Sequence, residues 1–275
     1  MTKIEAVCFW CAVGAFAMAW LVTLSRAVFQ KPAGVRPDGF IHAGVIFQAC
    51  AIGVRIWESG HLPYLMAYEN TLSLSLILMV SYLAAGHYSK KRGSPAGISS
   101  EFVTMFVLAA AMCLMGYGVL QDTGVEPLSP PYKSGWLYLH VFFAWLSHAA
   151  YIVATGYAVI ILTRGANGDG KAAWEKLAYQ WILAGFVCHT LMLAAGSLWA
   201  HYLWGSWWSW DPVETWTLFT WLFYGFYLHL RKHFNVKKEI LAALAVIGLI
   251  GILITFWGIQ IWVDSVHNMV YESGR

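Results

Sequence analysis

The residues with the clearest chemical potential form one tryptophan-rich segment, 199–216. It reads WAHYLWGSWWSWDPVETW and contains six of the 16 tryptophans of this 275-residue chain. Dense indole rings make a broad apolar surface, and two carboxylates stand near its C-terminal end. Such a surface suits a large, flat, hydrophobic ligand. We therefore predict a binding platform built from Trp204, Gly205, Trp207, Trp208, Trp210, Asp211 and Glu214.

The same segment has a structural interpretation. Tryptophans gather at the headgroup level of membranes as an interfacial belt. Asp211 followed by Pro212 has the pattern of a helix start, and Glu214 would then occupy the third helical position, where a carboxylate is favourable. A belt, however, spreads tryptophans over many helix ends. Here a glycine, a proline and two carboxylates stand at fixed offsets among them, which favours the binding platform.

Histidines supply the second kind of chemistry, because neutral imidazole is a good ligand for metals and for haem iron. Among the ten histidines, His140 and His267 stand next to the ends of apolar segments, and His229 stands within one. His233 follows His229 by four residues, so this pair has the alternative role of holding a metal on one helix face. Accessory candidates are His61, Glu69 and His201.

Two further histidines are predicted to be structural. His148 follows His140 by eight residues, which is about 12 Å along a helix, so the two cannot bind the same iron. We expect His148 to be a packed or hydrogen-bonded core residue. His189 stands in the middle of an apolar segment and is predicted to make a polar contact between helices.

Composition places all these residues in a membrane. Hydrophobic residues make up 59% of the chain and charged residues 11%, against about 45–50% and about 25% in soluble domains. These values exclude a disordered chain, collagen and a nucleic-acid-binding surface. The apolar runs are continuous and do not alternate, and eight are long enough to cross a bilayer. We predict an all-α polytopic integral membrane protein with helices at about 5–29, 38–57, 68–87, 101–120, 136–163, 174–200, 215–232 and 239–262.

The positions of Lys and Arg predict the orientation of these helices. Thirteen of the 17 fall in alternate loops, and cytoplasmic loops carry such an excess. Both termini and the tryptophan segment are therefore predicted on the external face, in one domain, 1–275, whose first span is generic. The cytoplasmic group is Arg26, Lys31, Arg36, Lys90, Lys91, Arg92, Arg164, Lys171, Lys176, Arg231, Lys232, Lys237 and Lys238. The other side holds Lys3, Arg55, Lys133 and Arg275.

The five cysteines lie in apolar stretches and do not form a disulfide framework. Cys8 and Cys11 have the C-x-x-C spacing, but no histidine follows them, so they are not a haem attachment site. A packing role and a redox or metal role both stay open for this pair.

With these motifs in view, the chain resembles a known family. Its tryptophan segment resembles the WWD motif of haem-handling proteins of cytochrome c maturation, and is similar to that of the CcsA (ResC) component of the system II cytochrome c synthase. The resemblance extends over about 50–275. It includes the segment 56–63 followed by Tyr68 and Glu69, the segments 138–141 and 227–231, and the position of His267.

This resemblance implies a function. His140 and His267 would be the two external axial ligands of haem b, carried as cargo, and His229 would be the ligand at an intramembrane entry site. The chain would take haem across the membrane and present it to the CxxCH motif of apocytochrome c, as a component of a haem lyase. Implied partners are a CcsB (ResB)-like membrane protein and thiol-reducing thioredoxin-like proteins. The implied location is the bacterial cytoplasmic membrane or a thylakoid-equivalent membrane.

Two other functions use similar residues. A membrane cytochrome b-type electron-transfer subunit would need histidine pairs on facing helices at matched depths. The haem-presenting, CcmC-like subunit of an ABC-type maturation system shares the tryptophan motif but usually has fewer spans. The candidate ligands stand at span ends beside the tryptophan segment, which favours the CcsA-like function over the electron-transfer subunit. The eight predicted spans favour it over the CcmC-like subunit.

Overall fold

The computed structural model describes residues 1–29, 35–91, 101–125, 127–163 and 169–258, and over these residues the chain is helical without strands. The helix boundaries agree with those predicted from the apolar runs to within a few residues, and the predicted end of the last helix at about 262 lies outside the described residues. The elements are α1 (Lys3–Phe29), α2 (Pro37–Ser59), α3 (Ala67–Lys91), α4 (Glu101–Val119), the 3-10 helix η1 (Pro130–Tyr132), α5 (Gly135–Thr163), α6 (Asp169–Trp204), α7 (Pro212–His233), α8 (Lys238–Leu253) and the π-helix η2 (Ile254–Gly258).

Six of these helices, α1, α2, α4, α5, α6 and α8, are long and apolar enough to cross a membrane. The other two, α3 and α7, are as long but less apolar, and each buries some polar side chains. In α3 these include Glu69, Thr71 and Ser75, and in α7 they include Thr217 and Thr220. The fold is that of a multi-pass integral membrane protein, as predicted. The external position of both termini stays a prediction.

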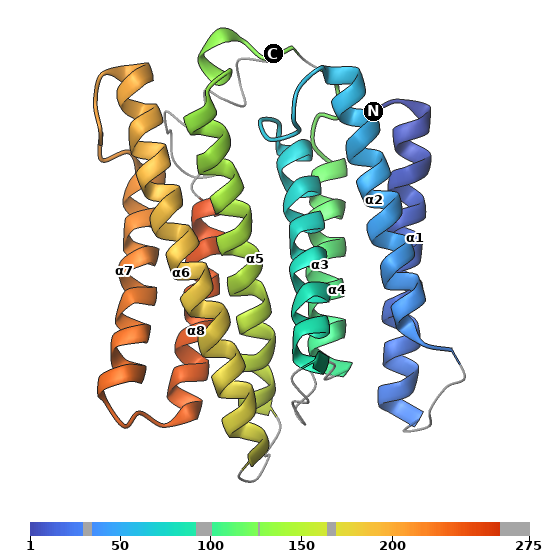
Figure 1. Ribbon diagram of the computed structural model, residues 1–275, viewed down its shortest axis with the longest axis vertical. Coiled ribbons are helices and arrows are strands. Elements are labelled where there is room, and N and C mark those ends of the chain that lie inside the picture. The colour runs from blue at the N-terminus through green and yellow to red at the C-terminus, as the bar shows by residue number, and fades with distance from the viewer. Residues whose placement is uncertain (30–34, 92–100, 126, 164–168, 259–275) are drawn as a thin grey trace. The chain divides into compact units, whose positions relative to one another are not determined.

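The helices separate into two compact units, the first ending at Leu128 and the second starting at Ser129. In the first unit α1 packs on α2 and α4, and α3 packs on α4. In the second unit α5 packs on α6 and α8, and α7 packs on α8. Figure 1 shows the helices of each unit running alongside one another. That both units form one haem-handling domain stays a prediction.

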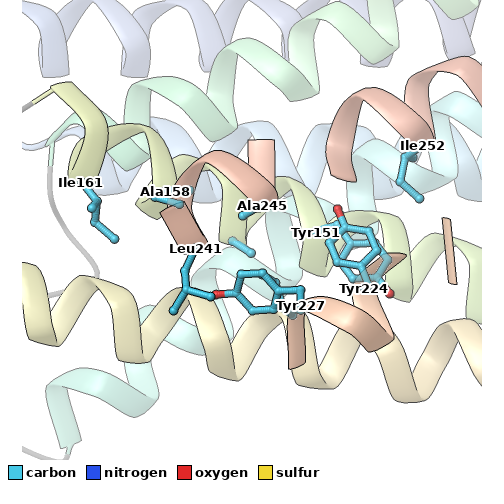
Figure 2. Close-up of a cluster of buried hydrophobic side chains, with 11 residues drawn as sticks. Tyr151, Ala158, Ile161, Tyr224, Tyr227, Leu241, Ala245 and Ile252 are labelled. Atoms are coloured by element: carbon cyan, nitrogen blue, oxygen red, sulfur yellow. The ribbon is translucent and has the colours of Figure 1, made fainter. Parts of the chain in front are cut away.

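The core of the second unit contains stacked aromatic rings. The rings of Tyr151 on α5 and Tyr224 on α7 are parallel to within 2°, with centroids 3.7 Å apart. Figure 2 shows the two rings lying one against the other. Each ring lies against a glycine of a neighbouring helix. A Cβ atom on Gly185 would lie 2.7 Å from the Tyr151 ring, and a Cβ atom on Gly248 would lie 2.6 Å from the Tyr224 ring. The missing side chains let large rings fit between closely packed helices.

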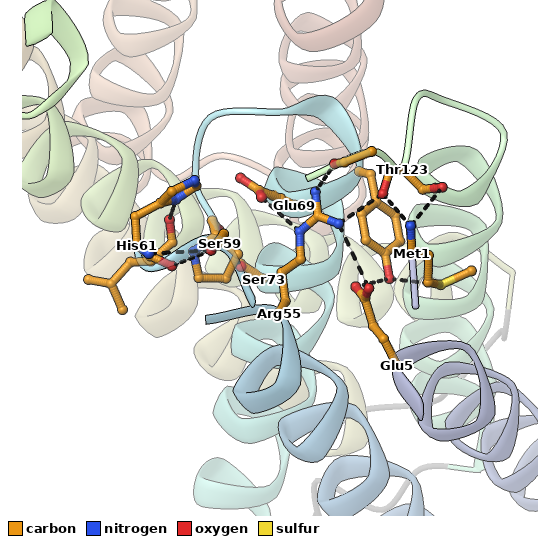
Figure 3. A network of polar contacts seen from close by, with 12 residues as sticks. Met1, Glu5, Arg55, Ser59, His61, Glu69, Ser73 and Thr123 are labelled. Atoms are coloured by element: carbon orange, nitrogen blue, oxygen red, sulfur yellow. Dashed lines mark hydrogen bonds and ion pairs between the residues drawn. The ribbon is translucent and has the colours of Figure 1, made fainter. Parts of the chain in front are cut away.

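The core of the first unit contains a buried ion-pair cluster, shown in Figure 3. Arg55, predicted from its charge to lie in an external loop group, is instead a fully buried residue of α2. Its guanidinium donates to Glu69 Oε1 at 2.9 Å and to the Thr123 carbonyl at 2.8 Å. Glu5 Oε2 lies 3.8 Å from Arg55 Nη1. A buried cation is tolerated here because two carboxylates and backbone carbonyls surround it.

We expect Arg55→Met to destabilise the protein by about 3–5 kcal/mol, because it leaves two buried carboxylates without their cation. The measurement is thermal unfolding in detergent. Arg26→Met is the matched control, since Arg26 pairs with Glu101 at 3.6 Å while both side chains are about one-third exposed. Loss of that pair should cost about 0–1 kcal/mol. Equal effects of the two substitutions would contradict the stabilising role of the buried cluster.

Candidate functional site

The tryptophan segment forms a short, closed loop between two long helices of the second unit. Helix α6 continues to Trp204 instead of ending at about 200, and α7 begins at Pro212 instead of 215, so the loop itself is only 205–211. Gly205 ends α6 in the left-handed conformation, with φ at 72°, and its N–H donates to the His201 carbonyl at 2.9 Å. A glycine suits this helix end because it lacks a Cβ atom.

The two carboxylates of the segment organise this loop. Asp211 is the N-cap of α7 and accepts from the Val213 N–H at 2.9 Å, which confirms the helix-start pattern seen in the sequence. Glu214 Oε2 reaches back and accepts from the Ser209 N–H at 2.8 Å, the Ser209 hydroxyl at 3.1 Å and the Asp211 N–H at 3.3 Å. This capping box satisfies N–H groups that the helix start would leave without partners. A direct role of either carboxylate in ligand binding stays a prediction.

The backbone at Trp210 is strained, which is unusual for a large side chain. Its φ is 60°, in the left-handed region that costs a non-glycine residue roughly 1–2 kcal/mol. The Thr215 hydroxyl donates to the Trp210 carbonyl at 3.3 Å, and the Thr215 N–H donates to the Asp211 carbonyl at 2.9 Å. The surrounding hydrogen bonds thus hold a conformation that leaves the Trp210 side chain 70% exposed. Such strain often accompanies function.

The tryptophans of the loop are held firmly but are not buried. Trp207 is 52% exposed, yet its ring stacks on His201 with centroids 4.1 Å apart and planes within 5°. Its carbonyl accepts from the Ser197 hydroxyl of α6 at 2.8 Å. Trp208 packs edge to face with Trp210, with centroids 6.0 Å apart. The loop therefore presents indole rings outward on a rigid backbone, as a binding platform requires.

Two buried nitrogens of this region lack a hydrogen-bond partner within the described ranges. They are His201 Nδ1 and Trp208 Nε1. Buried polar atoms are almost always hydrogen-bonded in folded proteins. Unpartnered buried nitrogens also occur in the helix core, for example at His189 Nε2, so these two do not by themselves indicate a ligand.

His140 lies in the second turn of α5 with a defined ring orientation. Its Nδ1 is 2.9 Å from the Met192 carbonyl oxygen of α6. A carbonyl only accepts, so Nδ1 must carry the hydrogen of this bond. In the neutral ring, Nε2 then carries the lone pair that an iron ion needs. This tautomer fits the predicted ligand role.

The family model described as cytochrome C assembly protein matches residues 9–267. The chain belongs to the cytochrome c assembly protein family. It is 30% identical to the cytochrome c biogenesis protein CcsA of Synechococcus sp. (strain CC9605), over 82% of this chain and 83% of that protein. It is also 30% identical to CcsA of Prochlorococcus marinus (strain MIT 9312), over 78% of each chain, and 26% identical to CcsA of Synechococcus sp. (strain CC9311), over 95% and 98%.

The remaining predicted ligands of this cytochrome c assembly protein have different surroundings. His229 is exposed on α7, and its ring centroid lies 4.7 Å from that of His233. In the parts of the chain that are described, no group of three or more His, Cys, Asp or Glu could hold a metal ion. His267 lies outside the described residues. The ligand roles of these histidines stay predictions.

The accessory candidates of the first unit have structural contacts. Glu69 is fully buried and paired with Arg55. His61 lies between α2 and α3, with Nδ1 2.8 Å from the Leu62 carbonyl oxygen. Burial raises the pKa of the nearby Tyr64 hydroxyl, and the charge of Glu69 raises it further, so this phenol stays protonated at neutral pH. An accessory role of His61, Glu69 and His201 in haem binding stays a prediction.

The two histidines predicted to be structural lie in the second unit. His189 is buried on α6, with Nδ1 3.5 Å from the Tyr151 hydroxyl, which confirms a polar contact between helices. His148 is half-buried and meets the Phe256 ring edge to face. The five cysteines are free thiols, so Cys8 and Cys11 do not form a disulfide with each other.

Proposed function

We propose that this chain receives haem and presents it at the tryptophan loop for covalent attachment to apocytochrome c. The observation that supports it best is a loop whose backbone is closely hydrogen-bonded while its indole rings stay exposed. A membrane protein gains nothing in core packing from such rings, whereas a porphyrin has a matching flat apolar face. The curated relatives bear the name cytochrome c biogenesis protein CcsA, and haem handling is the corresponding role.

The attachment reaction depends mainly on positioning. A thioether forms when a cysteine S–H adds across a haem vinyl group. The S–H bond and the vinyl π bond break, one C–S and one C–H bond form, and the addition consumes no net electrons. The reaction needs a free thiol held close to the vinyl carbon, and this proximity is what a rigid platform supplies. In this proposal the chain is a component of a cytochrome c synthase, and the exposed indoles hold the porphyrin while the vinyl edge faces the apocytochrome.

The proposal assigns three histidines to haem b iron. His140 and His267 are the external axial ligands, and His229 is the ligand at the entry site in the membrane. The Nε2 lone pair of His140 fits this donor set. Two neutral imidazoles would also set the reduction potential of the iron.

The proposal further includes partners and a location. The chain acts with a CcsB (ResB)-like membrane protein, apocytochrome c and thiol-reducing thioredoxin-like proteins. It lies in the bacterial cytoplasmic membrane or a thylakoid-equivalent membrane, with the tryptophan loop on the external face. This orientation would put the loop on the side where the thirteen basic residues of the alternate loops are absent.

We expect the protein, purified in detergent from haem-replete cells, to contain b-type haem with two nitrogen ligands. The measurement is the absorption spectrum of the reduced and oxidised protein, with haem counted per chain. His140→Ala should remove the external part of this signal, because it deletes one axial donor. A correctly inserted, colourless wild-type preparation would count against the proposed function.

A further inference from the structure

A glycine of α6 lies directly against the proposed ligand His140. A Cβ atom on Gly196 would be 2.5 Å from His140 Nδ1 and 2.8 Å from Cε1. Real Cβ atoms do not approach other atoms this closely, so any other residue at position 196 would push the imidazole away. The contact is with the ring nitrogen that makes the hydrogen bond, not with a distant part of the side chain.

Helix geometry explains why a glycine is needed at this position. The acceptor of the His140 hydrogen bond is the carbonyl of Met192, four residues before Gly196. In an α-helix that carbonyl also accepts from the N–H of residue 196, and its second lone pair is available to a side chain. Because Cβ atoms tilt toward the helix N-terminus, a side chain at 196 would cover this carbonyl. Glycine leaves it open.

We propose that Gly196 positions the external haem ligand, by giving the His140 imidazole access to the Met192 carbonyl. The bond keeps the hydrogen on Nδ1 and directs the lone pair of Nε2 to the iron. It also makes the imidazole a stronger donor, as such partners do at other metal sites. This inference rests on the proposed function, since it assumes that His140 binds haem iron.

The same stretch of α6 holds the tryptophan loop. Ser197 follows Gly196 and donates to the Trp207 carbonyl at 2.8 Å, and His201, one turn later, stacks on the Trp207 ring. Residues 192–201 of one rigid helix therefore seat both the iron ligand and the first exposed indole of the loop. A helix holds such groups at a fixed separation more accurately than a loop does. A displaced imidazole would thus lose its alignment with the platform.

The test is Gly196→Ala, compared with Gly185→Ala as the matched control. Both glycines lie on α6 and both contact a ring, since a Cβ atom on Gly185 would lie 2.7 Å from Tyr151 Cε1. Haem is titrated into the haem-free detergent-purified protein, and the reduction potential of the bound haem is measured. We expect Gly196→Ala to weaken haem binding about 10- to 100-fold, as loss of such a hydrogen bond does elsewhere. The potential should rise, because a weaker donor stabilises the ferric state less. Gly185→Ala should change neither value.

A second measurement does not depend on haem. The melting temperature of the haem-free protein is compared for wild type, Gly196→Ala, His140→Ala and the double variant. Gly196→Ala should lower it in the wild-type background and not in the His140→Ala background, where the ring is gone. If Gly196→Ala alone fails to insert, the double variant should insert. Persistent failure of the double variant would overturn the inference.

The outcomes separate the two proposals. If His140→Ala loses haem while Gly196→Ala binds it with wild-type affinity and potential, the positioning role of Gly196 is wrong and the proposed function stands. If His140→Ala keeps full haem with an unchanged spectrum, His140 is not the ligand, and the inference fails with that assignment.

Discussion

Simultaneous replacement of Trp207, Trp208 and Trp210 by alanine should cause most of the bound haem to be lost while the protein still inserts. The exposed fractions of Trp207 and Trp210 are 52% and 70%, so their removal opens no cavity in the helix core. Each indole that packs on a porphyrin should contribute about 1–3 kcal/mol, in the range of aromatic residues at binding hot spots. Even at the lower value, full additivity of the three would amount to about 3 kcal/mol, which is a loss of affinity of more than a hundredfold. The measurements are haem per purified chain and the amount of mature cytochrome c in cells.

Two variants serve as controls for the tryptophan replacement. Trp57→Ala removes an indole of α2 that is 88% exposed, and a belt tryptophan of this kind should be dispensable. Asp211→Asn tests the helix cap, because asparagine caps a helix about as well as aspartate. It should therefore preserve the protein level. A large loss of cytochrome c maturation at that level would show that the charge of Asp211 acts on haem, and unchanged maturation would leave Asp211 as a helix cap alone. Normal cytochrome c maturation in the triple tryptophan variant would refute the platform and favour the interfacial belt.

The positions of the helices could be predicted, because a long apolar run in a membrane protein of this kind forms an α-helix. Within a bilayer the backbone must satisfy its own hydrogen bonds, so a continuous apolar run of sufficient length becomes a helix. The start of α7 could also be predicted, because Asp211, Pro212 and Glu214 form a capping pattern within one short segment and need no distant partner. Local chemistry of this kind can be read from a single segment.

The buried ion-pair cluster could not be predicted, because its members come from distant parts of the chain. Glu5, Arg55, Glu69 and the carbonyl of Thr123 lie on three helices and a loop. The sequence signals were charges inside apolar runs, at Arg55, Glu5 and Glu69, and such charges do not by themselves name their partners. Its charge alone places Arg55 among the residues of the external loops, whereas the fold buries its side chain between carboxylates.

The close contact between Gly196 and His140 could not be predicted from the sequence either. Glycine is frequent in transmembrane helices, and nothing in the sequence distinguishes Gly196 from Gly14 or Gly53, where an added Cβ would meet nothing within 4 Å. Only the packing of α5 on α6 brings His140 to it. Residue type and the family resemblance thus predict His140 as a haem ligand, but not Met192 and Gly196, which contact its ring.

A second large effect is expected at the other end of α7. His229→Ala should lower the haem content of the purified protein several-fold and leave the spectrum of the external site unchanged. His229 is 18 residues from the N-cap Asp211, which is about 27 Å along a helix, so its loss cannot disturb the capping box directly. An exposed imidazole on a helix of a membrane protein is a functional candidate, because an ionisable group there costs free energy unless it has a partner.

The control for this prediction is His233→Ala, one turn further along α7. If His229 alone binds haem iron at the entry site, His233→Ala should keep most of the haem, although the two ring centroids are only 4.7 Å apart. If the two histidines instead hold a metal together, both variants should lose that metal equally and haem should be unaffected in either, because a two-histidine site needs both donors. The measurement is haem by absorption and metal by elemental analysis on the same preparations. A His229→Ala protein with full haem and normal cytochrome c maturation would remove the entry site from the proposed function, and the external site would then have to receive haem by another route.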